Sequence, residues 1–232
     1  MSYTITPDQL AQYESDGYFI ARGLLSEKQV AKVKNRIESV LNEGVGNDLR
    51  FDNTRADKKD VMGAAMFRKL ARLGRNDQTT WDNYFTADSV LDINRTFLGD
   101  NVQLWFDSIF TKPAKIGEAT PWHQDIGLWT FNPKSKWRKE AQRDALTIWT
   151  ALDPATKENG CLQVIPGSHT GEVIDHILYD DGLHPELPRE LVQDVTVDHI
   201  ELEPGDAIVW HAHLWHYSPP NMSDQNRLGI AQ

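Results

Sequence analysis

Apolar and polar residues alternate along this chain with two different periods, and the period changes near residue 100. Before that point, apolar residues recur every three or four positions, the spacing of helices that bury one face. The clearest case follows Ser26, where a capping-box pair with Gln29 precedes apolar residues at helical spacing and Gly44 ends the run. Four helices are predicted, at residues 6–17, 26–44, 57–74 and 87–99, with a short extended piece at 18–25.

After residue 100 the period shortens to two, which is typical of strands. Turn signals separate the apolar runs: ENG at 158–160, PGS at 166–168 and PGD at 204–206. Strands are predicted at residues 102–112, 145–152, 161–165, 195–202 and 207–211, and a polar, basic loop at 131–144. Helices followed by short strands favour a mainly β fold with flanking helices, a β-sandwich or jelly roll.

Composition narrows the possible functions. At 232 residues the chain fits one domain, with a mainly helical part to residue 100 and a β core from 101 that carries the chemistry. A net charge of −10 argues against binding to nucleic acid or to an anionic membrane. Cys161 is the only cysteine, and the N-terminus lacks the features of a signal peptide. No apolar run approaches the ~20 residues of a membrane span. A cytoplasmic protein is expected.

The segment PWHQDIGLW, residues 121–129, offers two metal-binding side chains, His123 and Asp125. On an extended segment they point to the same face, as adjacent ligands of a divalent metal would. A third ligand is expected from a distant strand that faces them across the barrel. Three histidines in GDAIVWHAHLWHYSPPNMSDQNR offer it: His211, His213 and His216. Spacing alone does not choose among them, and a separate metal cluster of these three histidines is the alternative.

The motifs HQD, NGCLQVIPGSHTG and GDAIVWHAHLWHYSPPNMSDQNR, in this order, resemble the phytanoyl-CoA dioxygenase family of iron(II)- and 2-oxoglutarate-dependent oxygenases. The resemblance runs from about Tyr18 through Arg227. In the family pattern the distal histidine precedes x-Ser, then an asparagine, and an arginine eleven positions on. His216, Ser218, Asn221 and Arg227 match this pattern.

The resemblance implies a double-stranded β-helix, cupin-like, with N-terminal helices packed on its major sheet. It also implies that His123, Asp125 and His216 bind iron(II) and carry the catalysis. The family couples decarboxylation of 2-oxoglutarate by dioxygen, which yields succinate and carbon dioxide, to oxidation of a substrate C–H bond. Relatives that halogenate lack the carboxylate. This chain retains Asp125, so hydroxylation is expected.

For 2-oxoglutarate, the resemblance implies that Arg227 binds the distal carboxylate, because a guanidinium offers a planar pair of donors. Ser218 is expected to add a hydrogen bond to the same group. By position in the family pattern, three more residues are expected at the cosubstrate pocket: Gln124, Trp149 and Lys112. The family usually continues further beyond the arginine than the five residues found here.

The expected substrate is a small organic molecule, free or attached to a carrier such as coenzyme A, with Trp129 and Asp107 as candidate contacts. The basic residues Arg68, Lys69 and Arg72 are expected on a solvated helix face, and docking of an acidic carrier there is the alternative. Two rival functions stay open: a cupin-type metal-dependent isomerase or hydrolase, and a catalytically silent binding or sensor protein. Oligomeric state is not predicted.

Overall fold

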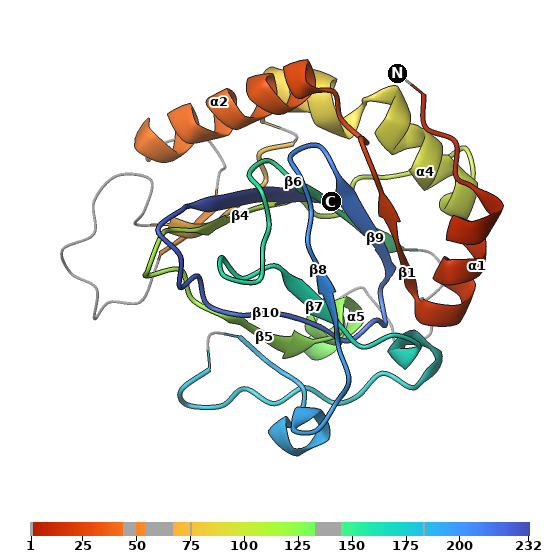
Figure 1. Ribbon diagram of the computed structural model, residues 1–232, viewed down its shortest axis with the longest axis vertical. Helices are drawn as coiled ribbons and strands as arrows, with labels where there is room; N and C mark the ends of the chain where they lie inside the picture. Colours follow the sequence, from red (N-terminus) through yellow and green to blue (C-terminus); the bar gives the residue numbers. More distant parts are fainter. Residues whose placement is uncertain (1, 44–49, 54–66, 75, 133–144, 183) are drawn as a thin grey trace.

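Two antiparallel β-sheets face each other, and helices cover the outer face of the larger sheet (Figure 1). The structure, a computed structural model, describes residues 2–43, 50–53, 67–74, 76–132, 145–182 and 184–232. The architecture confirms the predicted mainly β fold with flanking helices.

The larger sheet has seven strands in the order β1-β9-β6-β11-β4-β3-β2. β11, the latest of them in the sequence, lies between β6 and β4 and pairs with both. The bounds, in sheet order, are Tyr18–Ala21, Ala207–His211, Leu146–Ala151, Arg227–Ala231, Ser108–Lys112, Phe67–Ala71 and Arg50–Asn53. The smaller sheet has the order β5-β10-β7-β8, formed by Thr120–His123, His216–Ser218, Leu162–Val164 and Asp198–Ile200.

The helices pack on the larger sheet through one apolar core. The buried face of α2 (Glu27–Glu43) is formed by Val30, Val33, Ile37, Val40 and Leu41. It shares that core with Val90 and Ile93 of α4 (Asp88–Leu98) and with Ile148 and Ile230 of the sheet. The remaining helices are α1 (Pro7–Asp16), α3 (Gln78–Thr80), a π-helical turn (Trp81–Phe85), α5 (Asp125–Phe131) and 3₁₀ turns at Ser168–Thr170 and Arg189–Val192.

A second apolar core fills the space between the sheets. Trp149, Ile208 and Trp210 of the larger sheet share it with Leu162 and Val164 of the smaller one. All six residues of β6 are buried, because helices cover one face of this strand and the smaller sheet covers the other. A strand buried on both faces has few polar residues, and in 145–152 these are Thr147 and Thr150.

Several predictions for single elements are confirmed and others are wrong. Helices α1, α2 and α4 lie within their predicted ranges, and Ser26 and Gln29 exchange the hydrogen bonds of a capping box. The helix predicted at 57–74 is wrong where it is described, since Phe67–Ala71 is strand β3; residues 57–66 lie outside the described residues. The described part of the first hundred residues therefore includes strands β1, β2 and β3 as well as helices. The strand predicted at 102–112 is confined to Ser108–Lys112, and most of the predicted 131–144 loop lies outside the described residues.

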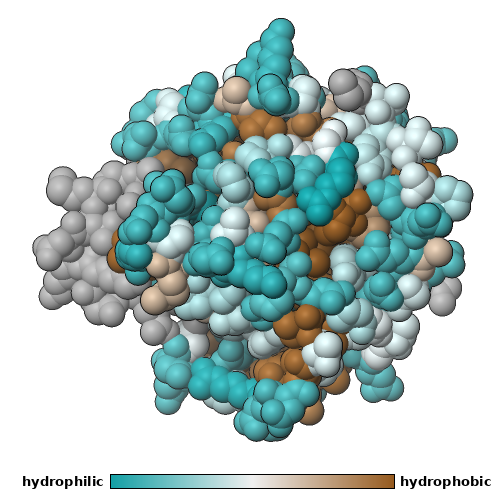
Figure 2. All heavy atoms as spheres, viewed as in Figure 1, coloured by the Kyte–Doolittle hydropathy of each residue, from teal (hydrophilic) through white to brown (hydrophobic). Residues whose placement is uncertain are grey.

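Polar side chains predominate on the face drawn in Figure 2, interrupted by separate apolar patches. Within the described part of the chain, no helix combines the length and the apolar character needed to cross a membrane.

Candidate metal and cosubstrate site

The three predicted metal ligands meet at one end of the space between the sheets. His123 is the last residue of β5 and lies directly opposite His216 on the paired strand β10. The third ligand is therefore on the neighbouring strand of the same sheet, and its predicted position across the barrel is wrong. Asp125 is the first residue of α5, after an extended Gln124 (φ −105°, ψ 135°). The His-x-Asp pair thus lies at a strand-to-helix junction and not along one continuous strand.

The donor atoms of this triad converge on a common point. Asp125 Oδ1 lies 3.8 Å from His123 Nε2 and 3.7 Å from His216 Nε2. The Nδ1 atoms lie 2.7 Å and 2.9 Å from the carbonyl oxygens of Pro121 and Leu214. Since a carbonyl only accepts, each Nδ1 carries a hydrogen, and Nε2 is the ring nitrogen that faces the other ligands. Two nitrogen lone pairs and a carboxylate oxygen facing one point need a cation between them, so the residues fit a divalent metal.

Burial keeps the histidine of β5 in the form that binds metal. Desolvation, followed by the neighbouring His216, lowers the pKa of His123 well below its ordinary value. The imidazole is therefore neutral at physiological pH, as a ligand must be.

The second oxygen of Asp125 has its own partners. Oδ2 accepts a hydrogen bond from the Thr147 hydroxyl at 2.7 Å and another from Trp210 Nε1 at 2.9 Å. The carboxylate is thus divided between one oxygen directed at the histidines and one held by the larger sheet.

Arg227, the first residue of β11, is a buried cation in the same cavity. Its Nη1 donates to the Gly160 carbonyl and to Ser218 Oγ, and its carbon Cζ lies 5.1 Å from the ring centroid of Trp149. No carboxylate of the described chain pairs with it, and Nε has no hydrogen-bond partner among the described residues. Burial lowers the pKa of Arg227 to about 10, which leaves the guanidinium charged at neutral pH. A buried cation without a counter-ion suits an anionic ligand.

Three further residues predicted at the site are directed elsewhere. The Gln124 amide is bonded to backbone groups of Glu172, Ile174 and His213 and does not line the cavity. Lys112 Nζ donates to three backbone carbonyls, of Glu118, Ser218 and Pro219. Burial, followed by the nearby Arg227, lowers the pKa of Lys112 to about 6, whereas these three acceptors favour its ammonium form. Asp107 is buried and accepts a hydrogen bond from the Gly74 amide outside the cavity lining.

The cavity that holds the triad and Arg227 has a volume of about 1220 Å³. Trp129 and Trp149 line it, and so do the cations Arg68 and Lys69, which lie on strand β3 and not on a solvated helix. Away from the ligands its wall is mostly apolar, with Phe85, Leu91, Phe97, Leu98, Leu104, Trp105 and Phe106.

The alternative cluster of three C-terminal histidines is not formed. Among the described residues, the group with metal-binding geometry is His123, Asp125 and His216. His211 Nδ1 instead accepts a hydrogen bond from the backbone amide of His213 at 3.1 Å, and Nδ1 of His213 is 3.4 Å from the Gly171 carbonyl.

Sequence patterns missed three residues at the site. The sequence assigns no role to Thr147 or to Trp210. His184 lies in a loop, with its ring centroid 5.0 Å from that of His123, and burial lowers its pKa to about 4. Finding Thr147 and Trp210 needs the strand register, because the two are direct partners between β6 and β9.

Comparison with known proteins finds relatives over nearly the whole chain. The sequence model of the family described as "Phytanoyl-CoA dioxygenase (PhyH)" matches residues 13–229. The peroxisomal phytanoyl-CoA dioxygenase of Bos taurus is 25% identical over 236 residues, which cover 97% of this chain and 66% of the relative. A probable alpha-ketoglutarate-dependent hypophosphite dioxygenase of Stutzerimonas stutzeri is 27% identical over 228 residues, covering 95% of this chain and 75% of the relative. The chain thus spans about two thirds of the length of the Bos taurus relative.

Solved structures share the fold. EctD from S. alaskensis, in a crystal with 2-oxoglutarate and 5-hydroxyectoine, has a TM-score of 0.77 at 23% identity, covering 98% of this chain and 74% of EctD. AviO1 from Streptomyces viridochromogenes Tue57 has a TM-score of 0.72 at 22% identity, covering 98% of this chain and 95% of AviO1. With a family match over nearly its whole length, this chain belongs to the phytanoyl-CoA dioxygenase (PhyH) family.

Proposed function

We propose that this chain is an iron(II)- and 2-oxoglutarate-dependent dioxygenase that hydroxylates an unactivated C–H bond of a small organic molecule. One observation carries the proposal: a convergent His123, Asp125 and His216 triad shares a cavity with a buried Arg227 that has no carboxylate partner in the described chain. A cupin-type isomerase or hydrolase would need the metal-binding triad, but it would not need a buried arginine that binds the carboxylate of 2-oxoglutarate.

The ligand set suits iron. His123, His216 and Asp125 would hold the metal, and a set of two histidines and one carboxylate would leave positions of an iron(II) ion open to the cosubstrate and to dioxygen. When bound, the metal supplies reduction of dioxygen coupled to decarboxylation of 2-oxoglutarate, so that substrate R–H, dioxygen and 2-oxoglutarate give R–OH, succinate and carbon dioxide.

Residues of both sheets bind the cosubstrate. Arg227 donates to the distal carboxylate of 2-oxoglutarate, and the burial of the guanidinium strengthens these charge-assisted bonds. Ser218 Oγ accepts from the guanidinium at 3.2 Å and donates to the Gly160 carbonyl at 2.8 Å, so it becomes a second donor to the carboxylate by turning its hydrogen away from that carbonyl. Trp149 covers the guanidinium and excludes water from it. Lys112 and Gln124 act indirectly, by fixing the backbone beside Ser218 and beside the ligands.

The substrate lies against the apolar wall of the cavity, with Trp129 as a contact, and Asp107 takes no part. Arg68 and Lys69 line the same cavity, which suits a substrate that bears an anionic group or a carrier such as coenzyme A. The proposed compartment is the cytoplasm, although the matching mammalian relatives are described as peroxisomal.

The test is an anaerobic titration of the metal-free protein with iron(II) and then 2-oxoglutarate, following the visible charge-transfer band of the chelate. The parent is expected to form the band. Arg227→Ala should bind iron as the parent does and bind 2-oxoglutarate roughly 10- to 100-fold more weakly, the effect of losing charged hydrogen bonds. Arg189→Ala is the matched control, because Arg189 lies on the surface and pairs with Asp181 and Glu186.

The outcomes separate the rivals. Iron binding without a chelate band, or an Arg227→Ala variant equal to the parent, would contradict the proposal and favour the cupin-type enzyme. A chelate that never consumes 2-oxoglutarate under dioxygen, with any candidate substrate, would favour a binding or sensor protein.

A further inference from the structure

The two oxygens of Asp125 lie in different surroundings, and the difference is built by two facing pairs of strands. On the smaller sheet, His123 and His216 are direct partners between β5 and β10. On the larger sheet, Thr147 and Trp210 are direct partners between β6 and β9. Asp125 extends between these pairs, with Oδ1 toward the histidines and Oδ2 toward the threonine and the tryptophan.

The hydrogen bonds to Oδ2 use its capacity as an acceptor. A carboxylate oxygen has two lone pairs, and the Thr147 hydroxyl (2.7 Å) and Trp210 Nε1 (2.9 Å) occupy both. Two-oxygen binding of the metal by Asp125 would break at least one of these bonds. Trp210 also packs its ring 4.9 Å from the His216 ring, so one side chain contacts two of the three ligands.

We propose that Thr147 and Trp210 are positioning residues that restrict Asp125 to one-oxygen coordination. Bidentate coordination would consume one of the three metal positions that the cosubstrate and dioxygen need. Thr147 and Trp210 thereby keep metal positions available to the cosubstrate and to dioxygen. Both lie on the larger sheet, which contributes none of the three ligands. This inference rests on the proposed function for the identity of the metal and the cosubstrate.

The register of the larger sheet makes the pair rigid. Thr147 lies on β6 and Trp210 lies on β9, two paired strands in the buried interior. Both residues are at most 7% exposed. Groups held in this way orient a ligand better than side chains on loops.

The experiment uses one isosteric variant, at Thr147, and one that keeps an aromatic ring, at Trp210, and it measures affinity and spectra apart from turnover. Thr147→Val removes the hydroxyl while keeping the shape, and Trp210→Phe removes the N–H. Each should weaken iron(II) binding about 10- to 100-fold in anaerobic equilibrium dialysis, the usual effect of losing a partner of a metal ligand. At saturating iron each should also weaken 2-oxoglutarate binding and shift the chelate band. Thr147→Ser keeps the hydroxyl and should restore parent behaviour.

Thr150→Val is the matched control. Thr150 lies on the same strand, but its hydroxyl bonds to the Tyr84 phenol at 3.2 Å, away from the site. This variant should match the parent in iron affinity and chelate spectrum.

The possible failures are distinguishable. If the parent itself forms no chelate, the proposed function is overturned. If the parent forms it, and Thr147→Val and Trp210→Phe bind iron and 2-oxoglutarate as the parent does, the positioning role is overturned while the function stands. A loss of thermal stability without a change in affinity or spectrum would assign the pair a purely structural role and overturn the inference.

Discussion

Gly229 shapes the cosubstrate end of the cavity by having no side chain. A β-carbon at this position would lie 2.0 Å from Trp149 Cζ2, so the indole occupies the space above the glycine. The same indole lies over the Arg227 guanidinium. The position of the Trp149 ring on β6 therefore depends on Gly229 of the paired strand β11. The surroundings of the guanidinium depend on the same contact.

Gly229→Ala should displace the Trp149 ring and weaken 2-oxoglutarate binding more than iron(II) binding. Overpacking of this kind also costs roughly 1–3 kcal/mol of stability. Denaturant unfolding and the anaerobic chelate titration check both effects. Gly171→Ala is the control, because its β-carbon would have an ordinary contact at 3.5 Å and its φ is −79°. Equal 2-oxoglutarate affinity in the parent and in Gly229→Ala would contradict this role.

At the residue scale, the sequence predicts ligands better than it predicts their surroundings. His123 and Asp125 follow from one motif, but spacing did not select His216 from the neighbouring histidines. The physical reason is that β9 ends at His211 and β10 begins at His216, so no continuous strand carries all three. Thr147 was not predictable, because its role comes from a strand register that no local pattern encodes.

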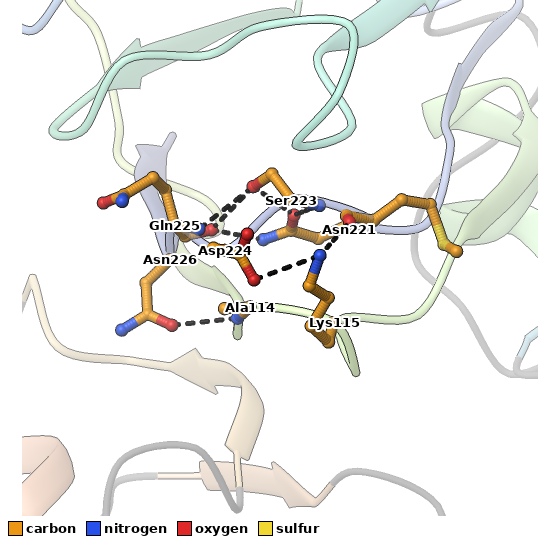
Figure 3. A network of polar contacts seen from close by, with 8 residues as sticks. Ala114, Lys115, Asn221, Ser223, Asp224, Gln225 and Asn226 are labelled. Carbon is orange, nitrogen blue, oxygen red and sulfur yellow. Dashed lines mark hydrogen bonds and ion pairs between the residues drawn. The ribbon is translucent and has the colours of Figure 1, made fainter.

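At the scale of elements, the turn between β10 and β11 sets the start of the strand that carries Arg227 (Figure 3). Asn221 is fully buried in it. Its Nδ2 donates to the Lys112 and Gln225 carbonyls at 2.8 Å and 2.7 Å, and its Oδ1 accepts from the amide and hydroxyl of Ser223. The family pattern includes this asparagine, and its contacts give it a structural role.

Asn221→Asp should loosen this turn, because a carboxylate oxygen would face the two carbonyls that now accept from Nδ2. The expected cost is about 1–3 kcal/mol of stability, together with weaker 2-oxoglutarate binding through a displaced Arg227. Thermal unfolding and chelate titration measure the two effects. Asp224→Ala provides the comparison, since this residue pairs with Lys115 at 3.1 Å in an exposed position (Figure 3) and should change stability by less than about 1 kcal/mol. An unchanged Asn221→Asp protein would contradict the role of the turn.

The helices at 6–17 and 26–44 and the strands at 145–152, 161–165 and 207–211 are confirmed, whereas the predictions for 57–74 and 102–107 are wrong where the structure describes them. Residues 67–71 carry helix-forming side chains, yet they pair with β4 through Lys69, Leu70 and Ala71, and this pairing overrides local propensity. The alternation at 102–107 predicted a strand, whereas residues 102–106 line the cavity. Helix α5 has only seven residues, too few for a helical period to be recognised.

At the scale of the whole molecule, buried histidines make stability depend on pH. Burial is the main cause that lowers the pKa of four of them: His123, His169, His184 and His213. The unfolded chain therefore takes up more protons than the folded chain below about pH 6.5, and stability falls with acidification. The stability that these histidines contribute is fully present above their ordinary pKa. It is lost as the pH falls toward their lower pKa values in the folded protein.

His184→Gln should flatten this dependence in the metal-free protein. With a folded pKa of about 4, His184 accounts for about 2 kcal/mol of the stability lost between pH 7 and pH 5, or roughly 4–8 °C in Tm. Thermal scans at both pH values in the presence of a chelator measure the slope. His199→Gln, at an exposed position, should keep the slope of the parent. If His184→Gln retains the full slope, His184 is not a source of the acid sensitivity.

The central place of β11 has a consequence for synthesis on the ribosome. Six strands of the larger sheet precede Arg227–Ala231 in the sequence, yet β11 lies between β6 and β4. A nascent chain that has not yet released these five residues from the exit tunnel holds two half-sheets, each with an unpaired edge. Arg227 is part of β11, so pairing of β11 with β4 and β6 completes the sheet and places the proposed 2-oxoglutarate-binding arginine in the same late step. Until that step the open edges are surfaces that a chaperone can protect and that a second nascent chain can join.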